Sequence, residues 1–242
     1  MTGNTMRAMA WAALAASAMI VAGAGAWAVT MPAGAPARPV VVELFQSQGC
    51  SSCPPADANL NALADRKDVL PLNFSVTYWD QLGWKDTFAR KEFTDRQWDY
   101  ARGLGNSNVG TPQVVVEGRR ELIGQDRREV DAAIAQARPA TAAKVAFVGG
   151  EVTVAAGAAP AGGADVWLVR YDPRTQLVPI RRGENGGKTL PQRNVVRELT
   201  KLGAWKGAAS RYPLGASKLP GLKTAVLVQT RGGGPILGAG RD

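Results

Sequence analysis

Residues 39–55 read PVVVELFQSQGCSSCPP, in which an apolar run leads into a pair of cysteines and then two prolines. The β-branched run predicts a buried strand, and the prolines predict the start of a helix. Cys50 and Cys53 are the only cysteines in the 242-residue sequence. A Cys-x-x-Cys pair between a strand and a helix is typical of a redox-active dithiol, because the positive end of the helix dipole stabilises a thiolate.

A structural disulfide is the alternative interpretation of this pair. Outside the cytoplasm a single pair of cysteines can persist as a disulfide. A bridge between residues three apart, however, closes so small a loop that it removes little entropy from the unfolded chain. The spacing therefore favours exchange chemistry. Cys50, nearer the helix start and more exposed, is the expected attacking thiolate, and Cys53 the buried resolving thiol, with the helix beginning only at Pro54.

Residues 1–28 are typical of a secretory signal peptide. Arg7 precedes an uncharged apolar run that ends in small residues, and cleavage is expected after Ala26 or Ala28. The alternative is an uncleaved membrane anchor. Either way the sequence predicts an exported protein, which is periplasmic or secreted if the segment is cleaved.

The charge and composition exclude several classes of protein. The formal net charge is +9, and basic residues occur in pairs such as Arg119-Arg120, never as a long run. With no nucleic-acid motif beside them, they predict a solvated basic surface with weak attraction to a membrane surface, and no nucleic-acid partner. Histidine is absent, which excludes Ser-His-Asp and Cys-His pairs and His-ligated zinc or haem. A copper carrier would lack its usual imidazole ligand, so no cofactor and no metal are expected.

Turn residues divide the first half of the chain into alternating strands and helices. Strands are expected at 40–45, 68–76, 113–117 and 121–123, and helices at 54–64, 86–104 and 126–137. Strands joined by a helix run parallel through a right-handed crossover, and the last two strands form an antiparallel hairpin.

This order, together with the Gly49-to-Pro54 motif and Thr111-Pro112, resembles the thioredoxin fold. Residues 43–57, 78–86 and 182–187 more narrowly resemble a family of uncharacterised secreted bacterial proteins with a thioredoxin-like domain. The resemblance implies an α/β thioredoxin-like domain at 39–138 and a cis peptide bond before Pro112. An ordinary trans-proline opening an edge strand is the alternative.

The second half of the chain has a different sequence pattern. Short apolar runs at 144–148, 151–155, 165–171, 177–182 and 223–230 are separated by Gly and Pro clusters. They predict a mostly β, sandwich-like C-terminal domain at 144–242. Residues 195–205 are compatible with either a strand or a short helix. Residues 181–187 are expected to form a turn, and contact of its charged side chains with the first domain is the alternative.

Three distant segments are expected to meet at one rim of the sheet. The first two strands end there, at Cys50 and at Tyr78-Trp79-Asp80, and the third strand begins there, at Thr111-Pro112. The backbone of Thr111 is then free to pair with a substrate strand, and Trp79 and Asp80 can contact the substrate. Burial in the core is the alternative for Trp79 and Trp84.

Two carboxylates near these segments have expected roles. Glu43 alternates with Val41 and Phe45, so it faces inward if they do, and it can then accept the proton of Cys53. Exposure to solvent, or pairing with an arginine, is the alternative for Glu43. Asp86 is expected to cap the following helix.

The sequence therefore predicts an exported thiol–disulfide oxidoreductase that acts through Cys50 and Cys53, supported by Pro112 and Glu43. Its expected partners are protein thiols or disulfides in the cell envelope and a redox partner protein. Ser51-Ser52 is neither basic nor aromatic and does not indicate a redox direction. The alternative is a non-catalytic thioredoxin-like scaffold whose disulfide is vestigial or structural.

Overall fold

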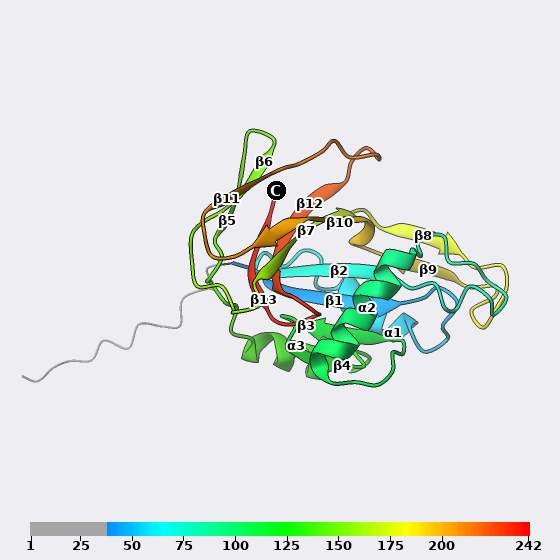
Figure 1. Ribbon diagram of the computed structural model, residues 1–242. Coiled ribbons are helices and arrows are strands. Elements are labelled where there is room, and N and C mark those ends of the chain that lie inside the picture. Colours follow the sequence, from blue (N-terminus) through cyan, green and yellow to red (C-terminus); the bar gives the residue numbers. More distant parts are fainter. Residues whose placement is uncertain (1–37) are drawn as a thin grey trace, which may run out of the picture. The chain divides into compact units, whose positions relative to one another are not determined.

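The strand expected at 40–45 is β1 (Val40–Gln46), which lies inside an eight-stranded mixed sheet (Figure 1). The computed structural model describes residues 38–242. The order of strands across the sheet is β13 (Ile236–Arg241), β12 (Lys223–Thr230), β7 (Ala164–Asp172), β10 (Val195–Trp205), β2 (Val69–Ser75), β1, β3 (Gln113–Val116), β4 (Arg120–Leu122). β1 is parallel to β2 and antiparallel to β3, and β3 and β4 form a hairpin. The parallel pair β1–β2, the reversed direction of β3 and the β3–β4 hairpin are expected from the sequence, although β2 and β3 are joined by a helix and do not run parallel.

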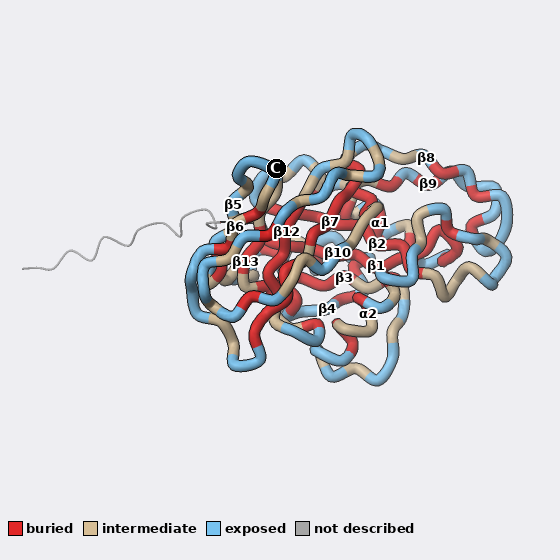
Figure 2. Tube along the Cα trace, turned by 45° about the horizontal axis from the view of Figure 1, so that its top comes forward, coloured by how far each residue is buried: buried red, intermediate tan, exposed pale blue. Residues whose placement is uncertain are grey.

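Three helices cover the two faces of this sheet. α1 (Pro54–Asn61) and α3 (Arg127–Gln136) pack on the face that carries Val40, Val42 and Leu44 of β1. α2 (Lys91–Leu104) packs on the opposite face, with Val41 and Phe45. The alternation of β1 therefore buries both of its faces, which is why its sequence is a nearly continuous apolar run (Figure 2). α1 begins at Pro54 with Cys53 as its N-cap, as expected.

The second half of the chain extends the same sheet. β10 joins β2 through the pair Val195 and Asn73, and β7, β12 and β13 continue outward from β10. A second sheet of three strands, β5 (Val145–Val148), β6 (Glu151–Val154) and β11 (Ser210–Pro213), packs on one face of β7 and β12.

The boundary expected between 138 and 144 therefore does not separate two sheets, and the described residues 38–242 belong to one compact unit. The alternation of apolar residues along a strand shows which side chains are buried, but it does not show which other strand is paired with it. β10 covers what would otherwise be the open edge of β2.

The remaining strands form a two-stranded hairpin of β8 (Gln176–Pro179) and β9 (Thr189–Gln192). Its apolar residues Val178, Ile180 and Leu190 pack against Trp84 and Phe88. Residues 195–205, ambiguous in the sequence, are strand β10. The expected signal peptide at 1–28 lies outside the described residues. No helix within 38–242 is long and apolar enough to cross a membrane.

Candidate functional site

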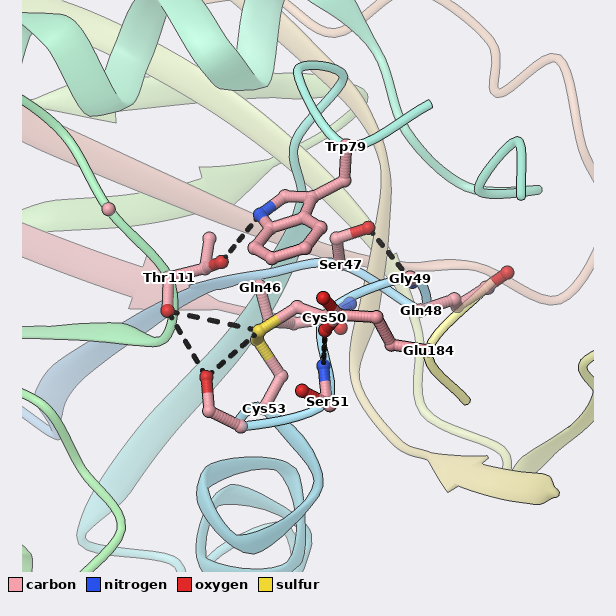
Figure 3. Close-up of a disulfide and its surroundings, with 12 residues drawn as sticks. Gln46, Ser47, Gln48, Gly49, Cys50, Ser51, Cys53, Trp79, Thr111 and Glu184 are labelled. Atoms are coloured by element: carbon pink, nitrogen blue, oxygen red, sulfur yellow. Dashed lines mark hydrogen bonds between the residues drawn. A yellow bond between two sulfur atoms is a disulfide. The ribbon is translucent and has the colours of Figure 1, made fainter. Parts of the chain in front are cut away.

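Cys50 and Cys53 form a disulfide between the end of β1 and the start of α1, with their Cα atoms 5.5 Å apart. The Thr111–Pro112 peptide bond is cis, as expected. The carbonyl oxygen of Thr111 lies 3.8 Å from Cys50 Sγ, and Trp79 Nε1 donates a hydrogen bond of 2.8 Å to Thr111 Oγ1. The predicted convergence of three segments is thus confirmed: Thr111 lies on one side of the disulfide and Trp79 lies over it (Figure 3).

The exposure expected for Cys50 is wrong. Both cysteines have 0% of their surface exposed. On the side of Thr111, the hydroxyl of Ser52 lies 3.2 Å from Cys50 Sγ and donates a bond of 3.5 Å to Thr111 O. Trp79 lies over the disulfide (Figure 3), and residues more than 130 positions later bond to the backbone of Cys50 and Ser51, which a local sequence pattern does not reveal. The disulfide as it stands is therefore closed to an incoming thiol.

Those later residues belong to the segment between β8 and β9. Asn185 is fully buried, and its Nδ2 donates to the carbonyl oxygens of Cys50 (2.8 Å) and Gln48 (3.0 Å). The exposed carboxylate of Glu184 accepts a bond of 3.1 Å from the backbone N–H of Ser51. This bond lowers the pKa of Glu184, so its side chain is ionised at neutral pH. The turn does contact the first half of the chain, which was the less favoured interpretation of its sequence. Its bonds to the backbone of Cys50 and Ser51 were not predicted.

Gln48 connects all three sequence segments that carried the family resemblance. Its backbone N–H donates 2.8 Å to Asp86 Oδ2, and its side-chain oxygen accepts 3.0 Å from Trp84 Nε1. Its carbonyl accepts from Asn185. The segments 43–57, 78–86 and 182–187 therefore form one hydrogen-bonded assembly around the disulfide.

The two tryptophans and Asp80 are partly buried parts of that assembly. Trp79 packs against the apolar core below it, and Trp84 packs against the β8–β9 hairpin. Asp80 Oδ1 accepts a bond of 3.0 Å from the backbone N–H of Asp86. The predicted roles of Trp79 and Asp80 in substrate binding stay predictions, and the contacts observed for both are internal.

Asp86 does not cap α2, which begins five residues later at Lys91. Its carboxylate instead accepts bonds from the backbone N–H groups of Gln48 and Phe88, both at 2.8 Å. Burial raises the pKa of Asp86 to about 6. A buried loop carboxylate and a helix cap look alike in sequence, because both precede a helical pattern.

The structure pairs Glu43 with an arginine, the alternative considered from the sequence, and places it away from Cys53. Glu43 faces inward on the side of the sheet covered by α2, where it forms an ion pair of 2.7 Å with Arg96 and accepts a bond from Tyr100. The disulfide leads into α1, which packs on the other face. The sheet itself thus separates Glu43 from Cys53, and no contact supports the expected proton transfer.

The polar groups on the α1 face near the disulfide are Gln46, Asn73, Ser75 and Asp57. Gln46 donates 2.8 Å to Ser75, and Asn73 donates 2.8 Å to Asp57. Asp57 lies in the first turn of α1 and is 4% exposed, and this burial raises its pKa to about 7. In the described part of the chain, Asp57 Oδ2 and Gln46 Oε1 have no hydrogen-bond partner. Asp57 was overlooked in the sequence because an acid in the first helical turn is common on solvated surfaces.

A groove of about 740 Å³ opens beside Ser52 and the cis peptide bond. Its walls include polar side chains such as Asn108 and Gln125, and one exposed apolar side chain, Ile123. The groove leads to the side of the disulfide that Ser52 and Thr111 cover. Within residues 38–242, no three cysteine, aspartate or glutamate side chains are grouped so that they could hold a metal ion.

The fold and site define a mixed α/β protein with a buried Cys-x-x-Cys disulfide where β1 meets α1, at one end of a central sheet. The chain belongs to a family described as protein of unknown function, DUF1223, whose model matches residues 41–229.

A crystal structure of protein AGR_C_4864 from Agrobacterium tumefaciens is 36% identical and has a TM-score of 0.68. The match covers 84% of this chain and 92% of that one. HBP35 of Porphyromonas gingivalis is 13% identical with a TM-score of 0.56, over 85% of this chain and 74% of that one, and indicates similarity of fold alone. No curated protein matches the sequence.

Proposed function

We propose that the protein is a thiol–disulfide oxidoreductase that exchanges disulfides with other proteins through Cys50 and Cys53. The observation that carries the proposal is the position of Thr111. Its carbonyl lies 3.8 Å from Cys50 Sγ at the inner end of the groove. A peptide lying in this groove would bring its own sulfur to Cys50 beside the backbone carbonyl of Thr111.

We also propose that residues 39–138 form a thioredoxin-like unit. The element order β1-α1-β2-α2-β3-β4-α3 and the sheet order β2-β1-β3-β4 support this classification. The position of the disulfide at the N-terminus of α1 also supports it, because the helix dipole stabilises a thiolate there. The amino-acid pattern of residues 1–28 supports export to the periplasm or beyond, where the partners would be envelope proteins and a redox partner protein.

The reaction balances without a cofactor. The Cys50 thiolate attacks a substrate disulfide, a mixed disulfide forms, and one substrate thiolate leaves. Cys53 loses its proton and attacks Cys50 Sγ, which restores the Cys50–Cys53 disulfide and releases the second substrate thiolate. The substrate gains two electrons and two protons, and the dithiol loses them. The reverse sequence oxidises a substrate dithiol.

The test uses the disulfides of insulin as substrate and dithiothreitol as reductant. We expect the protein to accelerate insulin reduction. After reduction and removal of dithiothreitol, we expect Cys53→Ser to accumulate a mixed disulfide with insulin and Cys50→Ser to accumulate none. A reduction potential less negative than about −300 mV, measured against glutathione buffers, would agree with an exchange-active pair. If neither variant forms a mixed disulfide, the proposal is wrong.

One observation favours a second candidate, a binding scaffold with a structural disulfide: both cysteines are 0% exposed. A potential below about −300 mV, with no acceleration of insulin reduction, would support this candidate. Against it stands the small loop that the disulfide closes, which removes little entropy from the unfolded chain.

A further inference from the structure

Ser52 lies in the short turn between the two cysteines, and hydrogen bonds that do not involve sulfur hold its backbone in place. The turn is closed by a bond of 3.2 Å from the Cys53 N–H to the carbonyl oxygen of Cys50. The carbonyl oxygen of Ser52 itself accepts a bond of 2.6 Å from the side-chain amide of Gln125, which also lines the groove. We therefore expect Ser52 to keep its position when the disulfide is reduced.

The hydroxyl of Ser52 lies between two acceptors. Its oxygen is 3.2 Å from Cys50 Sγ and 3.5 Å from the carbonyl oxygen of Thr111. A bond from a hydroxyl to an oxygen is usually about 2.7 to 2.8 Å long, so the bond to Thr111 is a long one. A hydroxyl has a single proton to donate. Which acceptor receives it therefore depends on how strong an acceptor the sulfur of Cys50 is.

Reduction changes the strength of this sulfur as an acceptor. In the disulfide, Cys50 Sγ is neutral and accepts weakly. As a thiolate it is ionised, and hydrogen bonds to an ionised acceptor are roughly twice as strong as neutral ones. Within residues 38–242, the Ser52 hydroxyl is the one donor that is hydrogen-bonded to this sulfur. Formation of the thiolate therefore draws the hydroxyl from Thr111 toward Cys50.

The carbonyl oxygen of Thr111 acts in the opposite direction. It lies 3.8 Å from Cys50 Sγ, where it can accept a bond from the protonated thiol but none from the thiolate. A thiol is a weak donor and this distance is long, whereas the Ser52 bond to the thiolate is shorter and charge-assisted. The effect of Ser52 therefore outweighs that of Thr111, and the balance favours the thiolate.

We infer that Ser52 is a further catalytic residue, whose hydroxyl stabilises the Cys50 thiolate and, with it, the reduced form of the pair. Movement of the hydroxyl to the sulfur also leaves the Thr111 carbonyl free to accept a backbone N–H from a substrate. This inference rests on the proposed function for its biological meaning. Its physical content is the fraction of Cys50 that is ionised, which can be measured without a protein substrate.

The measured reaction is the alkylation of Cys50 by iodoacetamide in the Cys53→Ser protein, in which Cys50 is the only thiol. The thiolate attacks the methylene carbon of the reagent, a sulfur–carbon bond forms, the carbon–iodine bond breaks and iodide leaves. Because the thiolate is the nucleophile, the rate rises with pH and reaches a plateau once Cys50 is ionised. The midpoint of this profile reports the stability of the thiolate, and the plateau reports access to the sulfur.

Ser52→Ala, made in the Cys53→Ser protein, removes the donor. We expect the midpoint to rise by about one pH unit, which is a tenfold lower thiolate fraction at a pH below both midpoints. Ser52→Thr keeps a hydroxyl and should restore the midpoint. Ser51→Ala is the matched control, since it makes the same truncation in the same turn at a residue whose N–H is bonded to Glu184, and it should leave the midpoint unchanged.

Three outcomes would overturn the inference. The first is an unchanged midpoint in Ser52→Ala, even with a higher plateau, because a higher plateau reports only the removal of cover from the sulfur. The second is an equal shift in Ser51→Ala, because the effect would then not depend on the hydroxyl that contacts the sulfur. The third is a shift in Ser52→Ala that Ser52→Thr does not reverse, because it would come from the shape of the turn.

A second measurement uses the protein with both cysteines, equilibrated with glutathione buffers at a pH above both midpoints. Loss of the hydroxyl destabilises the reduced form, so the equilibrium constant for reduction of the disulfide should fall about tenfold in Ser52→Ala. That factor corresponds to a reduction potential about 30 mV more negative. A potential in Ser52→Ala that is unchanged or less negative contradicts the inference.

The inference and the proposed function fail in distinguishable ways. If Ser52 stabilises the thiolate in a protein without exchange function, the midpoint will shift in Ser52→Ala but no variant will reduce insulin. If the protein is an oxidoreductase in which Ser52 has no such role, wild type will reduce insulin while the midpoints of Ser52→Ala and its parent coincide.

Discussion

Asn73 Nδ2 on β2 donates a hydrogen bond of 2.8 Å to Oδ1 of Asp57 on α1, close to the N-cap Cys53. The other carboxylate oxygen of Asp57 has no partner among the described residues. A buried carboxylate with one hydrogen bond is poorly compensated when charged, which is why burial raises its pKa to about 7. Asp57 therefore keeps its proton in the folded protein under conditions where the unfolded chain releases it.

This difference predicts a specific pH dependence of stability. Between about pH 4 and pH 7 the folded state binds the proton and the unfolded state does not, so the free energy of unfolding falls as pH rises, by up to about 1.4 kcal/mol per pH unit. Asp57→Asn has no proton to lose, so its stability relative to wild type should rise from pH 4 to pH 8. Urea denaturation at several pH values, with the disulfide intact, measures this.

The control for this experiment is Asp65→Asn. Asp65 is exposed, and its hydrogen bond with Arg193 lowers its pKa. The contribution of Asp65 to the free energy of unfolding has the opposite pH dependence. It is fully present above the pKa that Asp65 has in the unfolded chain, and it is lost as the pH falls through the lower pKa of the folded state. An Asp57→Asn variant whose stability difference from wild type does not change with pH would show that Asp57 is ionised in the folded protein.

The ion pair between Glu43 and Arg96 gives a second prediction. Their side chains are 0% and 3% exposed. Glu43→Gln leaves the buried guanidinium uncompensated, so we expect a loss of about 3 to 5 kcal/mol in the free energy of unfolding. The rate of disulfide reduction in the folded protein should not change, because Glu43 lies on the other face of the sheet. Lys91→Ala, which breaks an exposed pair with Asp95, should cost about 0.3 to 0.5 kcal/mol.

A slower exchange reaction in Glu43→Gln, with stability unchanged, would contradict this account and restore Glu43 as a candidate proton acceptor. The two outcomes are measured separately, because a loss of stability appears in the folding equilibrium and a role in proton transfer appears in the rate of reaction at the disulfide.

Elements with strong local signals were predictable from the sequence. The apolar run of β1, the prolines at the start of α1 and the N-cap Asp126 of α3 each encode their own structure. Asp126 accepts a bond of 2.8 Å from the N–H of Arg128 as a cap does. β13 was not predicted, because its sequence ILGAGR contains two glycines and an alanine, and its pairing with β12 determines its conformation.

The parts of the site that were not predictable depend on long-range contacts. The backbone of Cys50 is bonded by Asn185, which is 135 positions away. The role of Asp57 depends on Asn73 across the helix–sheet interface. In the sequence Asn185 lies among glycines and predicts only a turn. Local pattern therefore located the disulfide and its cis-proline neighbour, but not what covers them.

The single eight-stranded sheet leads to a third prediction, that residues 38–242 unfold in one transition. Leu227 of β12 is 0% exposed and belongs to the same core cluster as Phe45 and Leu72 of the first half. Leu227→Ala should lower the free energy of unfolding by about 3 kcal/mol. Circular dichroism and the accessibility of the disulfide to dithiothreitol should report the same midpoint in urea. Leu177→Ala, at a position 67% exposed, serves as the control and should have little effect.

Two separate midpoints, with the disulfide protected after the C-terminal strands have unfolded, would instead indicate independent domains. Leu227→Ala would then shift only the transition that the disulfide does not report.

The fourth prediction concerns the groove beside the cis peptide bond. Ile123 is 61% exposed and lines the groove, which makes it an apolar contact for a bound polypeptide. Burial of an isoleucine side chain is worth about 1.5 to 3 kcal/mol, so Ile123→Ser should lower kcat/KM for insulin reduction about tenfold or more. Reduction of the protein's own disulfide by dithiothreitol should be unchanged, because the small reagent does not need the groove. Val148→Ser, on β5 and 60% exposed, is the matched control. Equal effects of the two substitutions on insulin reduction would mean that the groove does not bind the substrate, and that an exchange reaction, if present, uses another approach to Cys50.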